Sequence, residues 1–428
     1  AVDVAAGDVF LCSGQSNMQL VLRSSQGGAA AVQRANQPLI RLFTVPMNAA
    51  YQPRDDCAGK WDTSTQETAA MFSAVGYYFG DELRRALDVP IGLINCSWGG
   101  QNIESFTPRA ALTEPDAWSR SLAARVDQEV KNHDPLLSQK RYEEALAKWE
   151  KSLAAFQQEA KAGDAKGKAP RKPPAPEHIP GPCRLFNGMI APLIPFGIRG
   201  VIWYQGEANR SDGLLYTGKM KVLIGGWRKA WGLGEFPFLF VQLAPCKYFG
   251  DRPRGEEPVG PPGAEPKPSQ RLPLVWQAQL ESLKIPNTGM SVTVDLDGPA
   301  LHPARKQEVG ERLARWALAN TYGRTGLVYS GPLFRSAIAE GEKIRLQFDH
   351  AGGGLASRDG KDLNWFEIAA DDKIYYPAKA VIAGSEVLVS SDQVTQPKYV
   401  RYGWDEIAQP NLMNKEGLPA SPFSSEFR

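Results

Sequence analysis

The 428-residue sequence has few of the residues that bind metals or form disulfides. It contains only four histidines, and its five cysteines include no CxxC pair and no Cys/His cluster, which argues against a structural zinc site. Cys12 and Cys96 lie in apolar runs that predict buried thiols. The loop-like surroundings of Cys57, Cys183 and Cys246 leave one disulfide open as an alternative.

The sequence also lacks an excess of charge of one sign, and it has no long apolar run. The formal net charge is only +2, which gives no basis for binding nucleic acid or a membrane surface. No run of about 18 consecutive apolar residues occurs, so no transmembrane helix is predicted. The chain begins Ala-Val-Asp, without an initiator Met or an apolar leader. We therefore expect a signal-cleaved product of the periplasm or the secreted fraction, or a fragment of a longer protein.

The sequence does contain several short, continuous apolar runs. Such runs suit strands that are buried on both faces, and they occupy residues 9–12, 91–97, 200–204, 238–243 and 291–294. Helical patterns alternate with them, at 71–87, at 214–231 and from Pro303 onwards. This alternation predicts a three-layer α/β domain with a parallel sheet, which we place at residues 1–324.

Three segments differ from this pattern. Residues 116–180 combine charged helical sequence with a Lys/Ala/Pro-rich run, which predicts a solvated helical insertion and a semi-rigid linker. Residues 250–270 are rich in Pro, Gly and Glu and predict a long surface loop ahead of a helix around 274–283. Residues 325–428 contain short alternating runs separated by turn residues, which predict a C-terminal antiparallel β domain resembling a sandwich.

The stretch Cys12-Ser-Gly-Gln-Ser-Asn-Met18 directly follows the first predicted strand. A serine at the tip of a sharp strand-to-helix turn exposes its hydroxyl and frees its backbone N–H, as a nucleophile for acyl transfer requires. Ser16 occupies that position. The alternative is that Ser16 only caps the following helix.

A serine nucleophile needs a base, and His302 is the best-placed histidine. It follows the predicted strand 291–294, and in an open α/β sheet the active site lies beyond the carboxyl ends of the strands. The other histidines lie in the polar insertion or in the C-terminal segment, at His133, His178 and His350. The alternative for His302 is an ordinary residue at a helix N-terminus.

Two further strand ends carry candidate oxyanion donors. Trp98-Gly99-Gly100 follows one strand, and a glycine there lets a backbone N–H approach the oxyanion closely. Gln205 follows another strand and offers a side-chain N–H. A tight turn and a polar loop are the alternative interpretations of these two motifs.

Together these motifs resemble the sialate O-acetylesterase family, a carbohydrate-esterase branch of the SGNH hydrolases. The similar stretches are Gly14-Gln-Ser-Asn-Met18, Gly99-Gly100 with Glu104, Trp203-Tyr-Gln-Gly-Glu207, His302-Pro303 with Lys306, Val309-Gly310 and Arg312-Leu-Ala314, and the C-terminal Val400–Trp404, Asn411-Leu412 and Gly417–Phe423. The resemblance covers about residues 5–115 and 182–428 and leaves out 116–180. It implies an SGNH-type fold and serine-dependent hydrolysis of acetyl esters on carbohydrates, with no metal or organic cofactor.

The resemblance also assigns roles at the site. Ser16 becomes the nucleophile, His302 the general base and acid, and the oxyanion hole consists of Ser16 N–H, Gly100 N–H and Gln205. The acid that orients His302 departs from the usual pattern, because Pro299 and Ala300 stand where relatives place an aspartate. Asp297 is our first candidate. Asp295, Glu207 and a Ser-His dyad held by a backbone carbonyl stay open.

The expected partner is an acetylated carbohydrate, and its sugar is the open question. O-acetylated sialic acid is the family's namesake, whereas acetylated xylan, xyloglucan or pectin fits a bacterial-looking chain equally well. Five aromatics near the predicted site offer stacking faces for sugar rings or simply fill the core, namely Trp98, Phe106, Trp203, Tyr204 and Trp276. The unusual acid position also leaves a carbohydrate-binding relative without catalysis as the alternative from another class.

Overall fold

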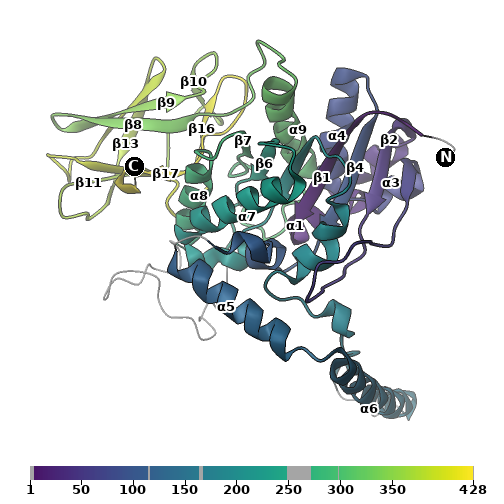
Figure 1. Cartoon of the computed structure of the whole chain (residues 1–428). Helices are drawn as coiled ribbons and strands as arrows, with labels where there is room; N and C mark the ends of the chain where they lie inside the picture. Colours follow the sequence, from purple (N-terminus) through teal and green to yellow (C-terminus); the bar gives the residue numbers. More distant parts are fainter. Residues whose placement is uncertain (1–3, 114–115, 163–166, 248–270, 297, 428) are drawn as a thin grey trace.

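The central element is a seven-stranded sheet in the order β3-β2-β4-β1-β5-β6-β7 (Figure 1). A computed structural model describes residues 4–113, 116–162, 167–247, 271–296 and 298–427. Six strands of the sheet are parallel, and β3 pairs with β2 in the antiparallel sense at one edge. The strands are β1 Asp8–Gly14, β2 Gln37–Thr44, β3 Trp61–Ser64, β4 Ile91–Ser97, β5 Gly200–Tyr204, β6 Phe238–Val241 and β7 Thr288–Ser291.

Helices cover both faces of this sheet, because alternate strand residues point to opposite sides. On one face, Phe10 of β1 meets Phe79 of α4 (Ala74–Leu87), and this helix packs against α9 (Lys306–Trp316). On the other face, Trp203 of β5 meets Trp227 of α7 (Leu215–Trp231), which packs against α8 (Arg271–Ser282). The predicted three-layer α/β fold with a parallel sheet is confirmed.

Several predicted boundaries were wrong. The last parallel strand is Thr288–Ser291, so the buried apolar residues after Ser291 continue past its end instead of forming the strand. The helix after His302 begins at Lys306, which places Pro303 in the preceding turn and not at the first helical position. Strands β2 and β3 were not predicted, because their polar and exposed residues interrupt the apolar pattern.

The insertion contains two long helices, as its charged periodic sequence predicted. These are α5 (Ala117–Asn132) and α6 (Pro135–Ala162), and Figure 1 shows α6 pointing away from the sheet. Val126 of α5 shares a small apolar cluster with Val222 of α7, which anchors the insertion to the α/β layers. The predicted loop 250–270 lies outside the described residues.

The C-terminal part is antiparallel, as predicted. Its sheets have the orders β12-β11-β15-β17, β13-β14-β9-β8 and β10-β16. The strands are β8 Leu333–Glu340, β9 Lys343–Asp349, β10 Leu355–Ser357, β11 Phe366–Ala369, β12 Tyr376–Pro377, β13 Lys379–Ala383, β14 Glu386–Ser390, β15 Tyr399–Tyr402, β16 Leu412–Asn414 and β17 Phe423–Ser424. The division into domains at 324/325 stays a prediction.

The cysteines do not form the disulfide that the sequence left open. None of the five forms a disulfide, and four of them are buried, including Cys183 and Cys246. Burial raises the pKa of the Cys183 thiol to about 12, so this thiol stays protonated and unreactive near neutral pH. Among the helices in the described ranges, none combines the length and apolarity that crossing a membrane requires.

Candidate active site

The site lies at the carboxyl end of β1. The strands β2 to β4 lie on one side of β1 in the sheet and the strands β5 to β7 lie on the other side, so the strand order changes direction at β1. The strand β1 lies between β4 and β5, so the segments leaving these three strands meet at one edge, as at the ligand sites of other open α/β sheets. Trp98 N–H donates to Gly14 O (3.0 Å), and Gln15 N–H donates to Tyr204 O (2.9 Å). These two bonds hold the three segments together at the site.

Gly14 makes the sharp turn that exposes Ser16. Its φ is +133°, and a Cβ at this position would lie 2.2 Å from Tyr204 O, so only glycine fits. The short helix α1 (Ser16–Gln19) starts directly afterwards, with Gln15 as its N-cap. The interpretation of Ser16 as a helix cap is therefore wrong, because Ser16 is the first helical residue. Its N–H has no intramolecular acceptor within the part of the chain that the structure describes.

The structure brings His302 to Ser16. His302 Nε2 lies 2.8 Å from Ser16 Oγ, although 286 positions separate the two residues in the sequence. Partial burial, followed by the charge of Lys306, lowers the pKa of His302 below its ordinary value. The imidazole is therefore neutral at pH 7, and Nε2 is able to accept the hydroxyl proton.

A buried polar network behind this pair fixes the segment that carries His302. Asn17 Nδ2 donates to Leu301 O (2.9 Å) and to Glu207 Oε1 (2.5 Å), and Lys306 Nζ donates to Asn17 Oδ1 (2.5 Å). The exposed fraction is 1% for Asn17, 5% for Glu207 and 0% for Lys306. Asn17 is the neighbour of Ser16, and Leu301 is the neighbour of His302. The network therefore connects the segments that carry Ser16 and His302.

Three acidic residues were candidates for orienting His302. Glu207 contacts Asn17, and burial raises the pKa of its carboxyl group although Asn17 and Lys306 oppose this shift. Both carboxylate oxygens of Asp295 accept hydrogen bonds from Arg312, at 2.7 and 2.6 Å. Asp297 lies outside the described residues. Within the described chain, neither Glu207 nor Asp295 is hydrogen-bonded to the His302 ring, and the role of Asp297 stays a prediction.

The turn after β4 carries Gly100, the predicted oxyanion donor. Gly99 lies against Ser16, since a Cβ on Gly99 would be 3.3 Å from Ser16 Cβ, and its N–H donates to Gln19 Oε1 (2.9 Å). Gly100 is exposed and has φ of +72°, and a Cβ at this position would have no atom within 4 Å. The role of the Gly100 N–H in an oxyanion hole stays a prediction.

Gln205 is placed differently from the expectation. Its side chain is fully buried, and Nε2 donates to Asn209 Oδ1 (2.7 Å) and to Gln101 O (3.0 Å). Because an amide nitrogen carries two hydrogens, both are already used. A direct oxyanion contact would require one of these bonds to break. Here Gln205 instead supports the turn next to Gly100.

A buried charged cluster that the sequence analysis missed supports Gln205. Lys219 Nζ donates to Glu104 Oε1 (2.5 Å) and to Asp212 Oδ2 (2.7 Å). Asn209 Nδ2 donates to the same two carboxylates, at 2.9 and 2.7 Å. Burial lowers the pKa of Lys219, but the two carboxylates outweigh that effect and raise it overall. The sequence contained one signal for these buried carboxylates: Glu104 lies shortly after Gly99-Gly100, and Glu207 lies shortly after Gln205.

Most of the candidate stacking aromatics belong to the core. Phe106, Trp203, Tyr204 and Trp276 are all at most 1% exposed, so packing and not sugar contact explains them. Trp98 is only half-buried. Its ring lies edge to face against that of His178, with the two ring centroids 6.1 Å apart. No group of three or more His, Cys, Asp or Glu side chains that would suit a metal ion occurs in the described ranges.

Comparison with known proteins matches the chain to a family described as carbohydrate esterase, sialic acid-specific acetylesterase, over residues 6–160 and 185–319. The match runs through α5 and most of α6, so the expectation that the whole insertion lies outside the family was wrong. Sialate O-acetylesterase of Rattus norvegicus is 29% identical over 99% of this chain and 78% of its own length. The enzyme of Mus musculus is 31% identical over 81% of this chain and 63% of its own.

A solved structure gives the same result. The crystal structure of a carbohydrate acetylesterase from Xanthomonas citri is 35% identical to this chain, with a TM-score of 0.76. The alignment covers 98% of this chain and 80% of the other. The likeness therefore includes the C-terminal β region as well as the α/β layers.

Proposed function

This chain belongs to the carbohydrate esterase family of sialic acid-specific acetylesterases, a family of carboxylic-ester hydrolases, and we propose that Ser16 is its nucleophile. The observation that carries the proposal is the 2.8 Å contact between Ser16 Oγ and a His302 imidazole that is neutral at pH 7. Such a contact is what an acyl-transfer site needs to activate a hydroxyl. It disfavours a carbohydrate-binding relative without catalysis.

The reaction then proceeds in two halves. Ser16 Oγ attacks the acetyl carbonyl carbon while His302 Nε2 takes the hydroxyl proton. In this proposal Ser16 N–H, which has no intramolecular acceptor among the described residues, and Gly100 N–H stabilise the tetrahedral oxyanion. Collapse of this intermediate breaks the ester bond, and His302 returns the proton to the departing sugar oxygen. A water molecule, activated by His302, then hydrolyses the acetyl-enzyme to acetate.

Asn17, Glu207 and Lys306 act as positioning residues in this scheme. They contact the Ser16 and His302 segments and not the reacting atoms. We keep Asp297 as the proposed orienting acid, and Gln205 as a proposed contributor to the oxyanion hole.

The substrate class within the family is a finer proposal. An acetyl ester of sialic acid is suggested by the names of the mammalian relatives, and acetylated xylan or xyloglucan is the alternative. Acetate release from 9-O-acetylated sialoside, acetylated xylan, acetylated xyloglucan and 4-nitrophenyl acetate separates them, with Ser16→Ala as the control. We expect serine-dependent release from at least one carbohydrate. Release from none of them, with the small ester still cleaved, would contradict the carbohydrate assignment.

A periplasmic or secreted location is part of the same proposal. It follows from a polymeric carbohydrate substrate, which a cell meets outside its cytoplasm. Fractionation of the native host with an antibody to this chain tests it, and recovery with the cytoplasmic fraction would contradict it.

A further inference from the structure

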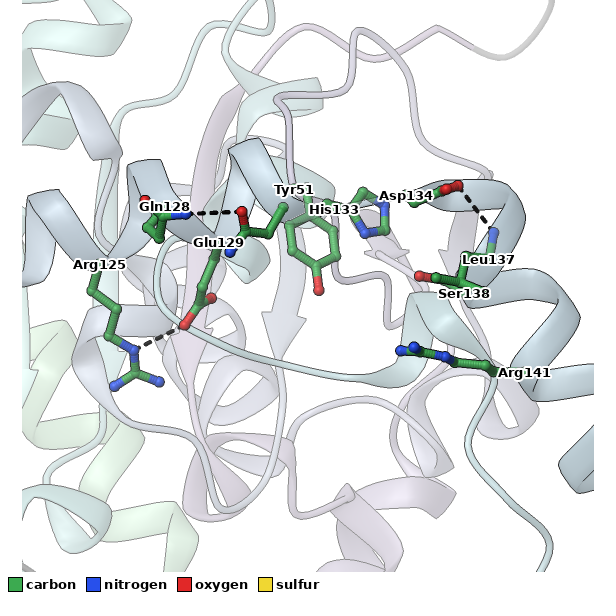
Figure 2. A pocket seen from close by; sticks show the side chains of 10 residues that line it. Tyr51, Arg125, Gln128, Glu129, His133, Asp134, Leu137, Ser138 and Arg141 are labelled. Atoms are coloured by element: carbon green, nitrogen blue, oxygen red, sulfur yellow. Dashed lines mark hydrogen bonds and ion pairs between the residues drawn. The ribbon is translucent and has the colours of Figure 1, made fainter.

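A cavity of about 420 Å³ lies on the insertion (Figure 2), and no residue of the catalytic scheme lines it. We call it the α5–α6 pocket. Its walls come from both helices of the insertion and from the segment that follows β2. The residues used below are Tyr51, Gln128, Glu129, His133, Ser138 and Arg141.

One wall of the α5–α6 pocket is a fixed aromatic stack. The Tyr51 and His133 rings lie 3.6 Å apart and within 10° of parallel. The Arg184 guanidinium carbon is 3.9 Å from the Tyr51 centroid, so Tyr51 is held between two planar groups. Burial, and then the charge of Arg184, lowers the pKa of His133, which keeps the imidazole neutral. The aromatic face left for a ligand in this stack is therefore that of His133, because His133 and Arg184 cover the two faces of Tyr51.

Polar groups face this stack from the helices. Figure 2 shows the Arg141 guanidinium and the Ser138 hydroxyl turned toward the space beside the Tyr51 ring. Gln128 Nε2 donates to Asn132 Oδ1 (2.8 Å), which fixes the Gln128 amide at the rim. A sugar ring presents C–H groups that pack on aromatic faces and hydroxyls that pair with amide and guanidinium groups. The lining therefore matches a glycosyl unit.

The charges of the α5–α6 pocket favour an uncharged sugar. Four ionised side chains line it: Arg125 and Arg141 are cationic, and Glu129 and Asp134 are anionic, so their formal charges cancel. Glu129 is bound by both Arg125 (2.9 Å) and Arg184 (2.8 Å). The lining residues themselves therefore offer an acidic sugar no excess of positive charge, whereas a neutral pentose or hexose carries no charge to compensate.

The α5–α6 pocket is connected to the catalytic serine through a short series of contacts. Gly99 lies against Ser16 and donates to Gln19 Oε1, and Gln19 Nε2 contacts Met47 Sδ at 3.8 Å. Tyr51 follows Met47 by four residues, a distance of at most about 14 Å along an extended chain. Residues 47–51 therefore link the surroundings of Ser16 to the stack, and the proposal below is that one saccharide contacts both.

We propose that the α5–α6 pocket binds a neutral glycosyl unit of the same acetylated oligosaccharide whose ester lies at Ser16. This inference rests on the proposed function, which it deepens from a reaction at one acetylated sugar to recognition of an extended chain. The insertion then serves to select polymeric substrates.

Single His133→Ala and Arg141→Ala variants test the proposal with acetylated xylo-oligosaccharides and with 4-nitrophenyl acetate. The KM for the oligosaccharide should rise at least about five-fold, and kcat should stay unchanged. The kinetics with the small ester should also stay unchanged, because that ester does not reach the α5–α6 pocket. Lys140→Ala is the matched control, since Lys140 is an exposed cation on α6 that does not line the α5–α6 pocket.

The outcomes separate the two proposals. Wild-type enzyme that cleaves the oligosaccharide, with both variants unchanged in KM, would overturn the pocket assignment alone. Wild-type enzyme that releases acetate from no carbohydrate would overturn the proposed function. In that case, calorimetric titration with deacetylated xylohexaose still decides the pocket: binding lost in His133→Ala but kept in Lys140→Ala supports it, and equal or absent binding in all three proteins overturns it.

Discussion

At the scale of single residues, the account depends on two side chains that are distant in sequence. The rule that active sites lie at strand ends was enough to predict that Ser16 and His302 meet, and the structure places them in contact. The sequence did not reveal the Asn17–Glu207–Lys306 network. Each of its members resembles an ordinary polar residue until the fold brings β5 and α9 next to α1.

The first prediction concerns pH. Because His302 must be neutral to act as a base, kcat/KM should fall as the pH drops through its pKa. Partial burial and Lys306 lower that pKa, so the acid limb should have its midpoint below 6.5. A pH profile of kcat/KM with 4-nitrophenyl acetate measures this midpoint, and a value at or above 6.5 would contradict the described environment of His302.

The second prediction concerns Asn17. Asn17→Ala removes the bonds to Leu301 O and Glu207 and leaves Lys306 without its Asn17 acceptor. We expect kcat to fall at least about ten-fold while KM changes little, because positioning of the base is lost and ground-state binding is not. Steady-state kinetics of protein verified as folded by circular dichroism provide the test. An unchanged kcat would remove Asn17 from the positioning role.

At the scale of elements, the turn at residues 99–101 links Ser16 to the buried charged cluster. Gln205 holds it through Gln101 O, and Asn209 in turn holds Gln205. Continuous apolar runs predicted β4 and β5 correctly, because both strands are buried on two faces. The same criterion misplaced β7, whose Thr288–Ser291 sequence is less apolar than the buried residues after it.

The third prediction follows from that turn. Gln205→Ala should lower kcat at least about ten-fold, either through a lost oxyanion contact or through movement of Gly100. The same variant should also melt at a lower temperature whichever cause applies, because three buried hydrogen-bond partners lose Gln205. If kcat is unaffected, neither role of Gln205 holds.

At the scale of the whole molecule, the C-terminal β region and the α/β layers share one apolar core. Gln242 Nε2 donates to Ser421 Oγ (2.8 Å), and Ser424 N–H donates to Gln277 Oε1 (3.0 Å), so β17 is bonded to α8. Composition alone predicted a change of architecture near residue 325. It carried no information on this contact, because packing between distant segments has no local signature.

The fourth prediction tests that contact. A chain truncated after residue 324 should melt at a lower temperature than the full chain and bind more of a hydrophobic dye. The truncation exposes to solvent the apolar surface of α8 and its neighbours that the C-terminal region buries. Thermal unfolding followed by circular dichroism measures the change. Equal Tm values for the two chains would show that the α/β part folds independently of the C-terminal region.

The central claim is that Ser16 is a nucleophile activated by His302. Its most direct test is labelling with a serine-reactive organophosphonate, followed by peptide mass spectrometry. We predict one label per chain, on Ser16, and loss of that label in His302→Ala. A label on another residue, or no label on the wild-type chain, would contradict the account.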